Sequence, residues 1–225
     1  MVGVVFLLTA TFITHSSFAF GWVRTIVFLI VGFGVPYLSE AVGLRTGFPF
    51  GKYTYAGYLG PVLPLGIPAY VLLSWVLLLY SGIFVVNALA TVLPTLQSDW
   101  SQIVFVSLLM VAMDALIDPV AVRVGHWIWD KPGKWFGIPA QNFFGWLLTA
   151  FATLSILNYA VDNLERQPLL EPLWLFYLPI LMFGLLNLHF IGLLRKVNLR
   201  RLAPLALGLA IGMIMLYFVV VTRGA

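Results

Sequence analysis

The sequence contains no cysteine and little charge of either sign. Charged residues make up 9% of its 225 residues, whereas soluble domains carry about 25%. The absence of cysteine excludes disulfides, thiolate metal sites and cysteine nucleophiles. The three histidines, at positions 15, 126 and 189, are scattered, so no metal site is predicted. No long polar linker or low-complexity segment interrupts residues 1–225, which predicts a single domain.

Long apolar runs dominate the sequence instead. Hydrophobic residues make up 62% of the chain, and the mean hydropathy is +1.03. Several runs reach the roughly 20 residues that a helix needs to cross a bilayer. They are continuously apolar rather than alternating, which favours helices over barrel strands. We therefore predict an all-α integral membrane protein, a bundle of about seven transmembrane helices. The predicted spans are residues 2–20, 23–43, 67–90, 102–118, 142–160, 172–194 and 202–222.

Basic residues are distributed unevenly between the two ends of these spans. Nine lie in the loops after spans 2, 4 and 6, and three lie on the opposite side. The positive-inside rule then predicts, in a cell membrane, a cytoplasmic N-terminus and an outside C-terminus. This distribution explains the net charge of +4 without a nucleic-acid partner. The nine are Arg45, Lys52, Arg123, Lys131, Lys134, Arg195, Lys196, Arg200 and Arg201, and the three are Arg24, Arg166 and Arg223.

The first span has a second interpretation as a signal peptide. Residues 17–19 loosely suit a cleavage site, but the basic start that such peptides carry is missing. We therefore expect the segment to be a membrane span.

Three carboxylates fall within or beside the predicted spans, where ionisable groups are costly and are functional candidates. Glu40 lies near the cytoplasmic end of span 2, and Asp114 and Asp118 near that of span 4. The two aspartates are four residues apart and share a helix face. Pro119 disfavours a helical residue before it, so we expect the helix to end at Asp118. A carboxyl group in such surroundings can stay protonated and act as an acid.

A second interpretation makes these carboxylates interfacial ion-pair partners of Arg45 and Arg123. Three carboxylates at one depth, next to two aromatic loops, favour the functional interpretation.

The two cytoplasmic loops are rich in aromatic residues, glycine and proline. One contains Tyr53 and Tyr55, and the other contains His126, Trp127 and Trp129. Such rings form a belt at the headgroup level, or they line a cavity and face a developing cation. Re-entrant backbone of this composition is tolerated only where it packs on protein or lines a cavity. His126 is either a proton carrier or simply hydrogen-bonded, and Asn142 is either a helix cap or a site residue.

A short motif occurs twice. Residues 66–69 and residues 137–140 both read Gly-Ile-Pro-Ala, and a tryptophan follows each proline by seven residues, at Trp75 and Trp146. Acidic residues precede both copies. The pattern indicates a two-helix unit repeated in the same orientation, with coincidence as the alternative because Gly-Pro helix starts are common.

These motifs resemble the carotenoid biosynthesis protein family. The resemblance is carried by Glu40, the Gly-Phe-Pro-Phe-Gly-Lys-Tyr-x-Tyr run at 47–55 and the Gly-Pro at 60–61. The second half contributes Asp118-Pro119, the His-Trp-Ile-Trp run at 126–129 and the aromatic segment at 135–146. Specific motifs cover roughly residues 34–146, and only the pattern of apolar spans agrees beyond them.

The resemblance implies a cofactor-free hydratase that adds water to the terminal C1,C2 double bond of an acyclic carotenoid. A carboxyl group among Asp114 and Asp118 would protonate the alkene, with Glu40 as its partner. Aromatic rings would shield the tertiary cation, and Arg45 would tune Glu40. The expected substrate-binding set is Arg45, Tyr53, Tyr55, His126, Trp127, Trp129 and Asn142. Expected partners are the carotenoid, membrane lipids and other enzymes of the pathway. The carotenoid and the oligomeric state stay open.

Three other functions compete with hydration. A carotenoid end-group cyclase or isomerase also begins by protonating a terminal alkene. A retinal photoreceptor needs a lysine within a span for its Schiff base, and the four lysines at 52, 131, 134 and 196 lie in or beside loops. A transporter or assembly subunit is the third, but transport favours inverted repeats and charged groups at the midplane.

Overall fold

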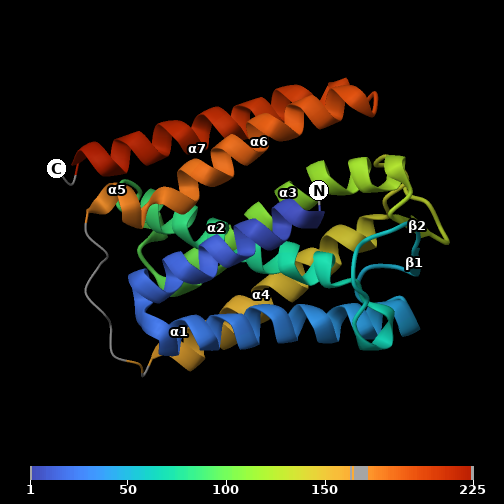
Figure 1. The fold of residues 1–225 in the computed structure, drawn as a ribbon, viewed down its shortest axis with the longest axis horizontal. Helices are drawn as coiled ribbons and strands as arrows, with labels where there is room; N and C mark the ends of the chain where they lie inside the picture. The colour runs from blue at the N-terminus through green and yellow to red at the C-terminus, as the bar shows by residue number, and fades with distance from the viewer. Residues whose placement is uncertain (1, 163, 165–171, 224–225) are drawn as a thin grey trace.

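The computed structural model describes residues 2–162, 164 and 172–223, most of which are helical (Figure 1). Within this part of the chain, six helices are long and apolar enough to cross a membrane. The predicted all-α membrane class is therefore confirmed. The α-helices are α1 (Val2–Thr46), α2 (Ala69–Ala90), α3 (Asp99–Val124), α4 (Ala140–Asp162), α5 (Leu173–Phe176), α6 (Leu178–Lys196) and α7 (Ala203–Arg223). The strands are β1 (Tyr53–Tyr55) and β2 (Trp127–Trp129), and short 3-10 turns lie at Pro64–Gly66, Pro94–Leu96 and Arg200–Leu202.

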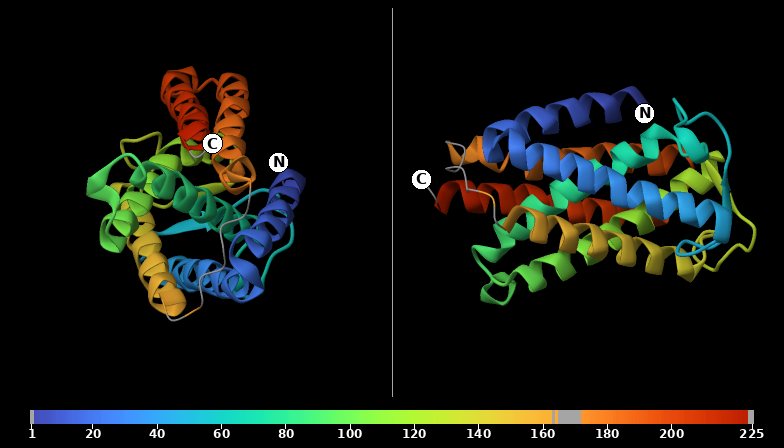
Figure 2. Two further views of the ribbon diagram at one scale, coloured as in Figure 1. Left: turned by 90° about the vertical axis from the view of Figure 1, so that its left-hand side faces the viewer. Right: turned by 90° about the horizontal axis from the view of Figure 1, so that it is seen from below.

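Helix α1 contains two of the predicted spans, because the chain reverses at Gly21. This residue has φ 79° and ψ 161°, a conformation that residues with a Cβ rarely adopt. The two arms of α1, residues 2–20 and 22–46, run in roughly opposite directions (Figures 1 and 2). A hydrogen bond of 2.9 Å between Ser16 Oγ and Thr25 Oγ1 joins them near the reversal. With both arms counted, the described residues contain the seven predicted spans.

Helix α2 lies at the centre of the bundle (Figure 2). Most of its residues are buried, and it contacts α1, α3, α6 and α7. Its sequence is almost entirely apolar, which suits a helix with neighbours on every side. Helices α6 and α7 pack on each other as a pair beside the other helices. The second arm of α1 together with α2, α3 and α4 therefore forms a four-helix core.

Helix α3 continues through Pro119 to Val124, so the prediction that it ends at Asp118 is wrong. A proline inside a helix leaves the carbonyl four residues earlier without its usual donor. That carbonyl belongs to Ala115, and the indole N–H of Trp135 donates to it at 3.1 Å. The following loop thus replaces the missing hydrogen bond, and Asp118 lies more than one full turn before the end of the helix at Val124.

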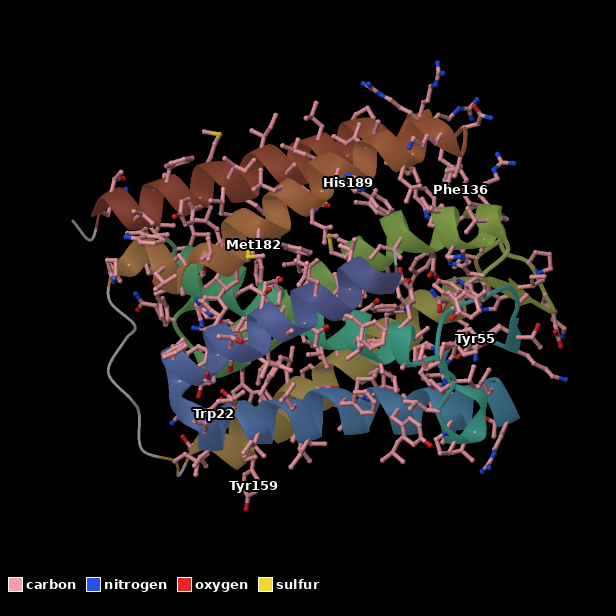
Figure 3. All side chains as sticks on the ribbon, viewed as in Figure 1. Trp22, Tyr55, Phe136, Tyr159, Met182 and His189 are labelled. Atoms are coloured by element: carbon pink, nitrogen blue, oxygen red, sulfur yellow. The ribbon has the colours of Figure 1, made fainter. Side chains whose placement is uncertain are left out.

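The loops after α1 and α3 meet at one end of the bundle, which we name the strand end. Strands β1 and β2 pair antiparallel there, with Tyr53 opposite Trp129 and Tyr55 opposite Trp127. Figure 3 shows Tyr55 and Phe136 at this end and Trp22 near the opposite one. We name the opposite end, where α1 reverses and α3 begins, the far end.

The two copies of the repeated motif face each other in the structure. Trp75 on α2 and Trp146 on α4 stack with ring centroids 3.9 Å apart and planes inclined by 15°. Strands β1 and β2, which precede the two copies, are likewise each other's partners. Equivalent segments of the two motif copies therefore lie against each other within the four-helix core.

Candidate active site

A small cavity lies at the strand end between two walls that bear carboxyl groups. Glu40 reaches it from α1 and Asp118 from α3. Its volume is about 40 Å³, which is room for a few water molecules at roughly 10–15 Å³ each. We name it the carboxylate cavity. It is lined by Glu40, Phe50, Tyr53, Tyr55, Val71, Asp118, Trp127, Trp129, Asn142 and Trp146.

Glu40 forms the wall on the α1 side and is held by three donors. The hydroxyl groups of Tyr53 and Tyr55 both donate to its Oε2 atom, the latter at 2.7 Å. The indole N–H of Trp75 donates to Oε1 at 3.4 Å. Burial raises the pKa of both tyrosines well above its usual value, so they remain protonated donors. These donors fix the position of the Glu40 carboxyl group at the cavity, which suits it to exchange a proton with a molecule bound there.

Two aspartates form the opposite wall and share one amide group. The Asn142 side-chain N–H₂ donates to Oδ2 of Asp114 and to Oδ2 of Asp118, each at 2.7 Å. The Oδ1 atom of Asp114 is buried and has no hydrogen-bond partner among the described residues. An ionised carboxylate is costly in such a place, and adjacent carboxyl groups tend to share a proton. The pair can therefore hold a proton, and Asp118 is the member that faces the cavity.

The strand pair covers the cavity with aromatic rings. The Tyr55 and Trp127 rings meet edge to face with centroids 6.2 Å apart, and those of Tyr53 and Trp129 lie 6.0 Å apart. The indole N–H of Trp129 donates to the Phe50 carbonyl at 3.1 Å and anchors the cap to the first loop. Aromatic faces attract cations, so this cap can stabilise positive charge that develops in the cavity.

The structure brings together most of the predicted site, but not all of it. Helix α4 begins at Ala140, so the interpretation of Asn142 as its N-cap is wrong, and the Asn142 side chain bonds to the two aspartates instead. Arg45 is exposed, and His126 packs beside Trp127 without lining the cavity. Burial lowers the pKa of His126, which favours its neutral form.

The alternative of interfacial ion pairs finds no support at these carboxylates. Among the described residues, the ion pair is between Lys52 Nζ and Asp130 Oδ2, 3.6 Å apart on the surface, and it involves none of the three carboxylates. In the same part of the chain, no three His, Asp or Glu side chains converge closely enough to hold a metal ion.

Four lining or supporting residues were missed as site residues: Phe50, Val71, Trp75 and Trp146. The two tryptophans had a sequence signal, because the repeated motif singles them out. Phe50 and Val71 are ordinary apolar residues, and only the fold places them at the cavity.

The close packing of Gly145 against Phe50 gives a first testable prediction. A Cβ at position 145 would lie 2.5 Å from Phe50 Cδ1 and 3.0 Å from the Pro49 carbonyl carbon. Phe50 is buried, so Gly145→Ala should destabilise the protein by about 1–3 kcal/mol through overpacking. Thermal unfolding in detergent micelles would show a lowered midpoint. Gly34→Ala is the matched control, because a Cβ there meets nothing within 4 Å. Equal midpoints for the two variants would contradict the prediction.

The fold and site define a multi-pass helical membrane protein with buried carboxyl groups beneath an aromatic cap. The family model described as carotenoid biosynthesis protein matches residues 1–215. This chain belongs to that family, as its motifs predicted.

One characterised relative gives a more specific comparison. The chain is 33% identical over 135 residues to the bisanhydrobacterioruberin hydratase of Haloarcula japonica. The match covers 56% of this chain and 42% of that protein, so the chain spans less than half of the relative's length. The comparison with solved structures gives no match.

Proposed function

We propose that this protein adds water to the terminal C1,C2 double bond of an acyclic carotenoid and forms a tertiary alcohol. The observation that carries the proposal is the pair of carboxyl-bearing walls that face each other across an aromatic cavity. The name of the Haloarcula japonica relative, a hydratase, supports the same reaction type.

The first step is protonation of the alkene by Asp118. The proton moves from the Asp118 carboxyl group to C2, the less substituted carbon, and the alkene electron pair forms the new C–H bond. C1 becomes a tertiary cation, and Asp118 becomes a carboxylate. The faces of Trp127 and Trp129 stabilise the cation, and Asp114 with Asn142 holds the acid in place.

The second step is capture of the cation by water. A water oxygen bonds to C1, and one of its protons passes to the Glu40 carboxylate. The hydroxyls of Tyr53 and Tyr55 hold the Glu40 carboxyl group in position for this transfer. Transfer of the proton from Glu40 back to Asp118 restores both groups, so the reaction is balanced and redox-neutral.

Hydration needs less room at this site than cyclisation does. A hydratase must admit one chain end and one water molecule, whereas a cyclase must also fold back several carbons of the chain so that an internal double bond reaches the cation. The carboxylate cavity, at about 40 Å³, has to widen for either reaction, and it has to widen less for hydration.

The charge distribution supports a strand end that faces the cytoplasm. Of the basic residues, Arg45, Lys52, Arg123 and the pair Arg200 and Arg201 belong to the loops and helix ends there (Figures 1 and 3). Arg24 lies at the far end, and Arg166 is outside the described residues. We expect the carotenoid and the membrane lipids as partners, and the carotenoid end to enter the site from the cytoplasmic half of the bilayer.

Pigment analysis tests the proposal. The chain would be expressed in a bacterium that accumulates lycopene, and the extract examined by liquid chromatography and mass spectrometry. We expect a more polar pigment that is heavier by one water and keeps the lycopene chromophore, because the hydrated bond lies outside the conjugated system. An isomer of unchanged mass with a shortened chromophore would establish cyclisation instead. Unchanged lycopene, and an unchanged longer acyclic carotenoid, in membranes that contain the protein would refute the enzyme assignment.

A further inference from the structure

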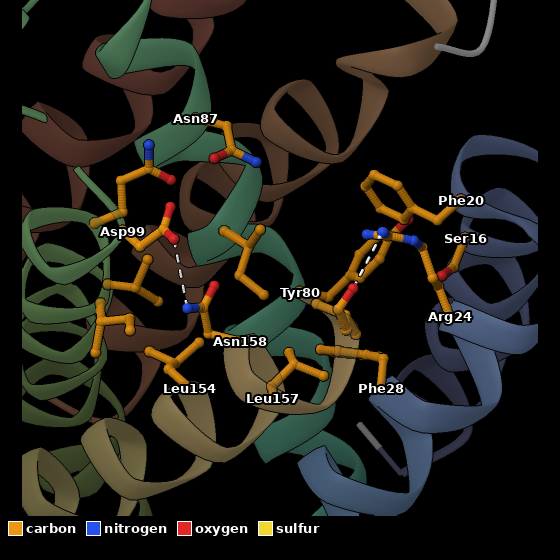
Figure 4. A pocket seen from close by; sticks show the side chains of 15 residues that line it. Ser16, Phe20, Arg24, Phe28, Tyr80, Asn87, Asp99, Leu154, Leu157 and Asn158 are labelled. Atoms are coloured by element: carbon orange, nitrogen blue, oxygen red, sulfur yellow. Dashed lines mark hydrogen bonds between the residues drawn. The ribbon is translucent and has the colours of Figure 1, made fainter. Parts of the chain in front are cut away.

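A second and larger cavity lies at the far end of the same four-helix core (Figure 4). Its volume is about 250 Å³, close to the lower limit of small-molecule sites at roughly 300 Å³. Both arms of α1 and helices α2, α3 and α4 contribute to it. The stacked Trp75 and Trp146 lie at the other cavity, so the two are separate features of the core.

The lining of this far cavity combines an apolar wall with several polar side chains. Phe20, Phe28, Leu154 and Leu157 belong to the apolar part. The polar part includes the amide groups of Asn87, Gln102 and Asn158, and Figure 4 shows Asn87, Asp99 and Asn158 grouped on one side. Such a lining suits a molecule with a polar head and an apolar body.

The two charged residues of the lining already have partners. Arg24 donates to the carbonyls of Val161, at 3.2 Å, and Leu164, at 2.5 Å. The Asn158 amide donates to Asp99 Oδ2 at 3.5 Å. Arg24 disfavours a cationic ligand and Asp99 an anionic one, so we expect a ligand with a neutral head group. An amide presents both a donor and an acceptor, which together match a hydroxyl group.

We propose that the far cavity binds the hydroxyl-bearing, branched end of an isoprenoid chain, namely the tertiary-alcohol end that hydration creates. The hydroxyl group bonds to the amides of Asn87 and Asn158, and the methyl branches contact the apolar wall. This identification of the ligand rests on the proposed function. The far cavity is then a holding site for hydrated product at the membrane face opposite to the carboxylate cavity.

Binding of a short analogue tests this without any need for catalysis. The probe is 2,6-dimethyloctan-2-ol, a saturated tertiary alcohol, and its matched control is the hydrocarbon 2,6-dimethyloctane. Saturation-transfer NMR on the full chain in nanodiscs, compared with empty nanodiscs, measures specific binding. We expect the alcohol to bind, Asn158→Leu to weaken its binding about fivefold, and Asn87→Leu to do the same. Asn187→Leu on α6 is the control variant, because its amide bonds within its own helix to Phe183.

The position of the probe is checked by photolabelling. A diazirine derivative of the alcohol should label peptides that contain Phe20 to Phe28 or Leu154 to Val161, also in the Glu40→Gln variant. Labelling confined to the strand end would overturn the proposal. So would equal binding of alcohol and hydrocarbon, or binding that Asn158→Leu and Asn87→Leu leave unchanged. These results are independent of pigment analysis, so failure of the far site and failure of the hydratase assignment remain distinguishable.

Discussion

Replacing Asp118 by Asn is expected to lower hydrated pigment formation by at least about a hundredfold, because an amide cannot supply the proton that starts the reaction. The change keeps the size of the side chain and its position beside Asn142. Product would be measured in isolated membranes that contain equal amounts of protein, with lycopene as substrate. We expect the substrate to be recovered unchanged.

Two further variants show whether this loss is specific to Asp118. Asp114→Asn should lose less activity, because Asp114 does not line the cavity. It only shares the Asn142 amide with Asp118 and helps to position that acid. Asp130→Asn removes only the surface ion pair with Lys52 and should leave activity unchanged. If Asp118→Asn keeps more than a tenth of the activity, the proton comes from another group.

Replacing Glu40 by Gln is expected to reduce hydration by about a hundredfold or more for a different reason. The amide cannot accept a proton from the attacking water, and its N–H₂ group opposes the two tyrosine hydroxyls. The acid on the other wall remains, so the alkene is still protonated. Tyr55→Phe removes one hydrogen-bond donor to Glu40. We expect hydration activity to fall about tenfold, which corresponds to the loss of one hydrogen bond to a charged group.

Deuterium oxide separates the two roles. In D₂O the Asp118 carboxyl group carries a deuteron, which it adds to C2 of lycopene in Glu40→Gln membranes. The cation is not captured by water and loses a proton to re-form the alkene, so recovered lycopene should carry deuterium at its end group. In Asp118→Asn membranes no deuterium should enter, because the cation never forms. Mass spectrometry of the recovered substrate reads both outcomes. Deuterium in the Asp118 variant and none in the Glu40 variant would reverse the two assignments.

The membrane spans were predictable because transfer into lipid is a property of local composition. Each predicted span corresponds to a helix or helix arm, since about 20 continuous apolar residues suffice to cross a bilayer. The helix boundary at Asp118 was not predictable in the same way. Pro119 disfavours helix locally, but Trp135 supplies a hydrogen bond from 20 residues further along the chain.

The sequence predicted the chemical groups of the candidate site, but only some of the residues that form it. Buried carboxyl groups and aromatic loops stand out in an apolar sequence because they are costly there. Arg45 is close to Glu40 along the chain and was therefore predicted to contact it. Its side chain is exposed instead. Phe50 and Val71 line the cavity although nothing in their residue type distinguishes them.

The sequence by itself determined the membrane class, the seven spans, the family motifs and the carboxyl groups around which chemistry is organised. These follow from composition and from short-range spacing. Only the tertiary structure decided that Glu40 receives tyrosine and tryptophan donors while Asp114 and Asp118 share one amide. It also decided that a second cavity exists at the far end. Hydrogen-bond partners and cavities depend on contacts between distant segments, and no local pattern in the sequence specifies those contacts.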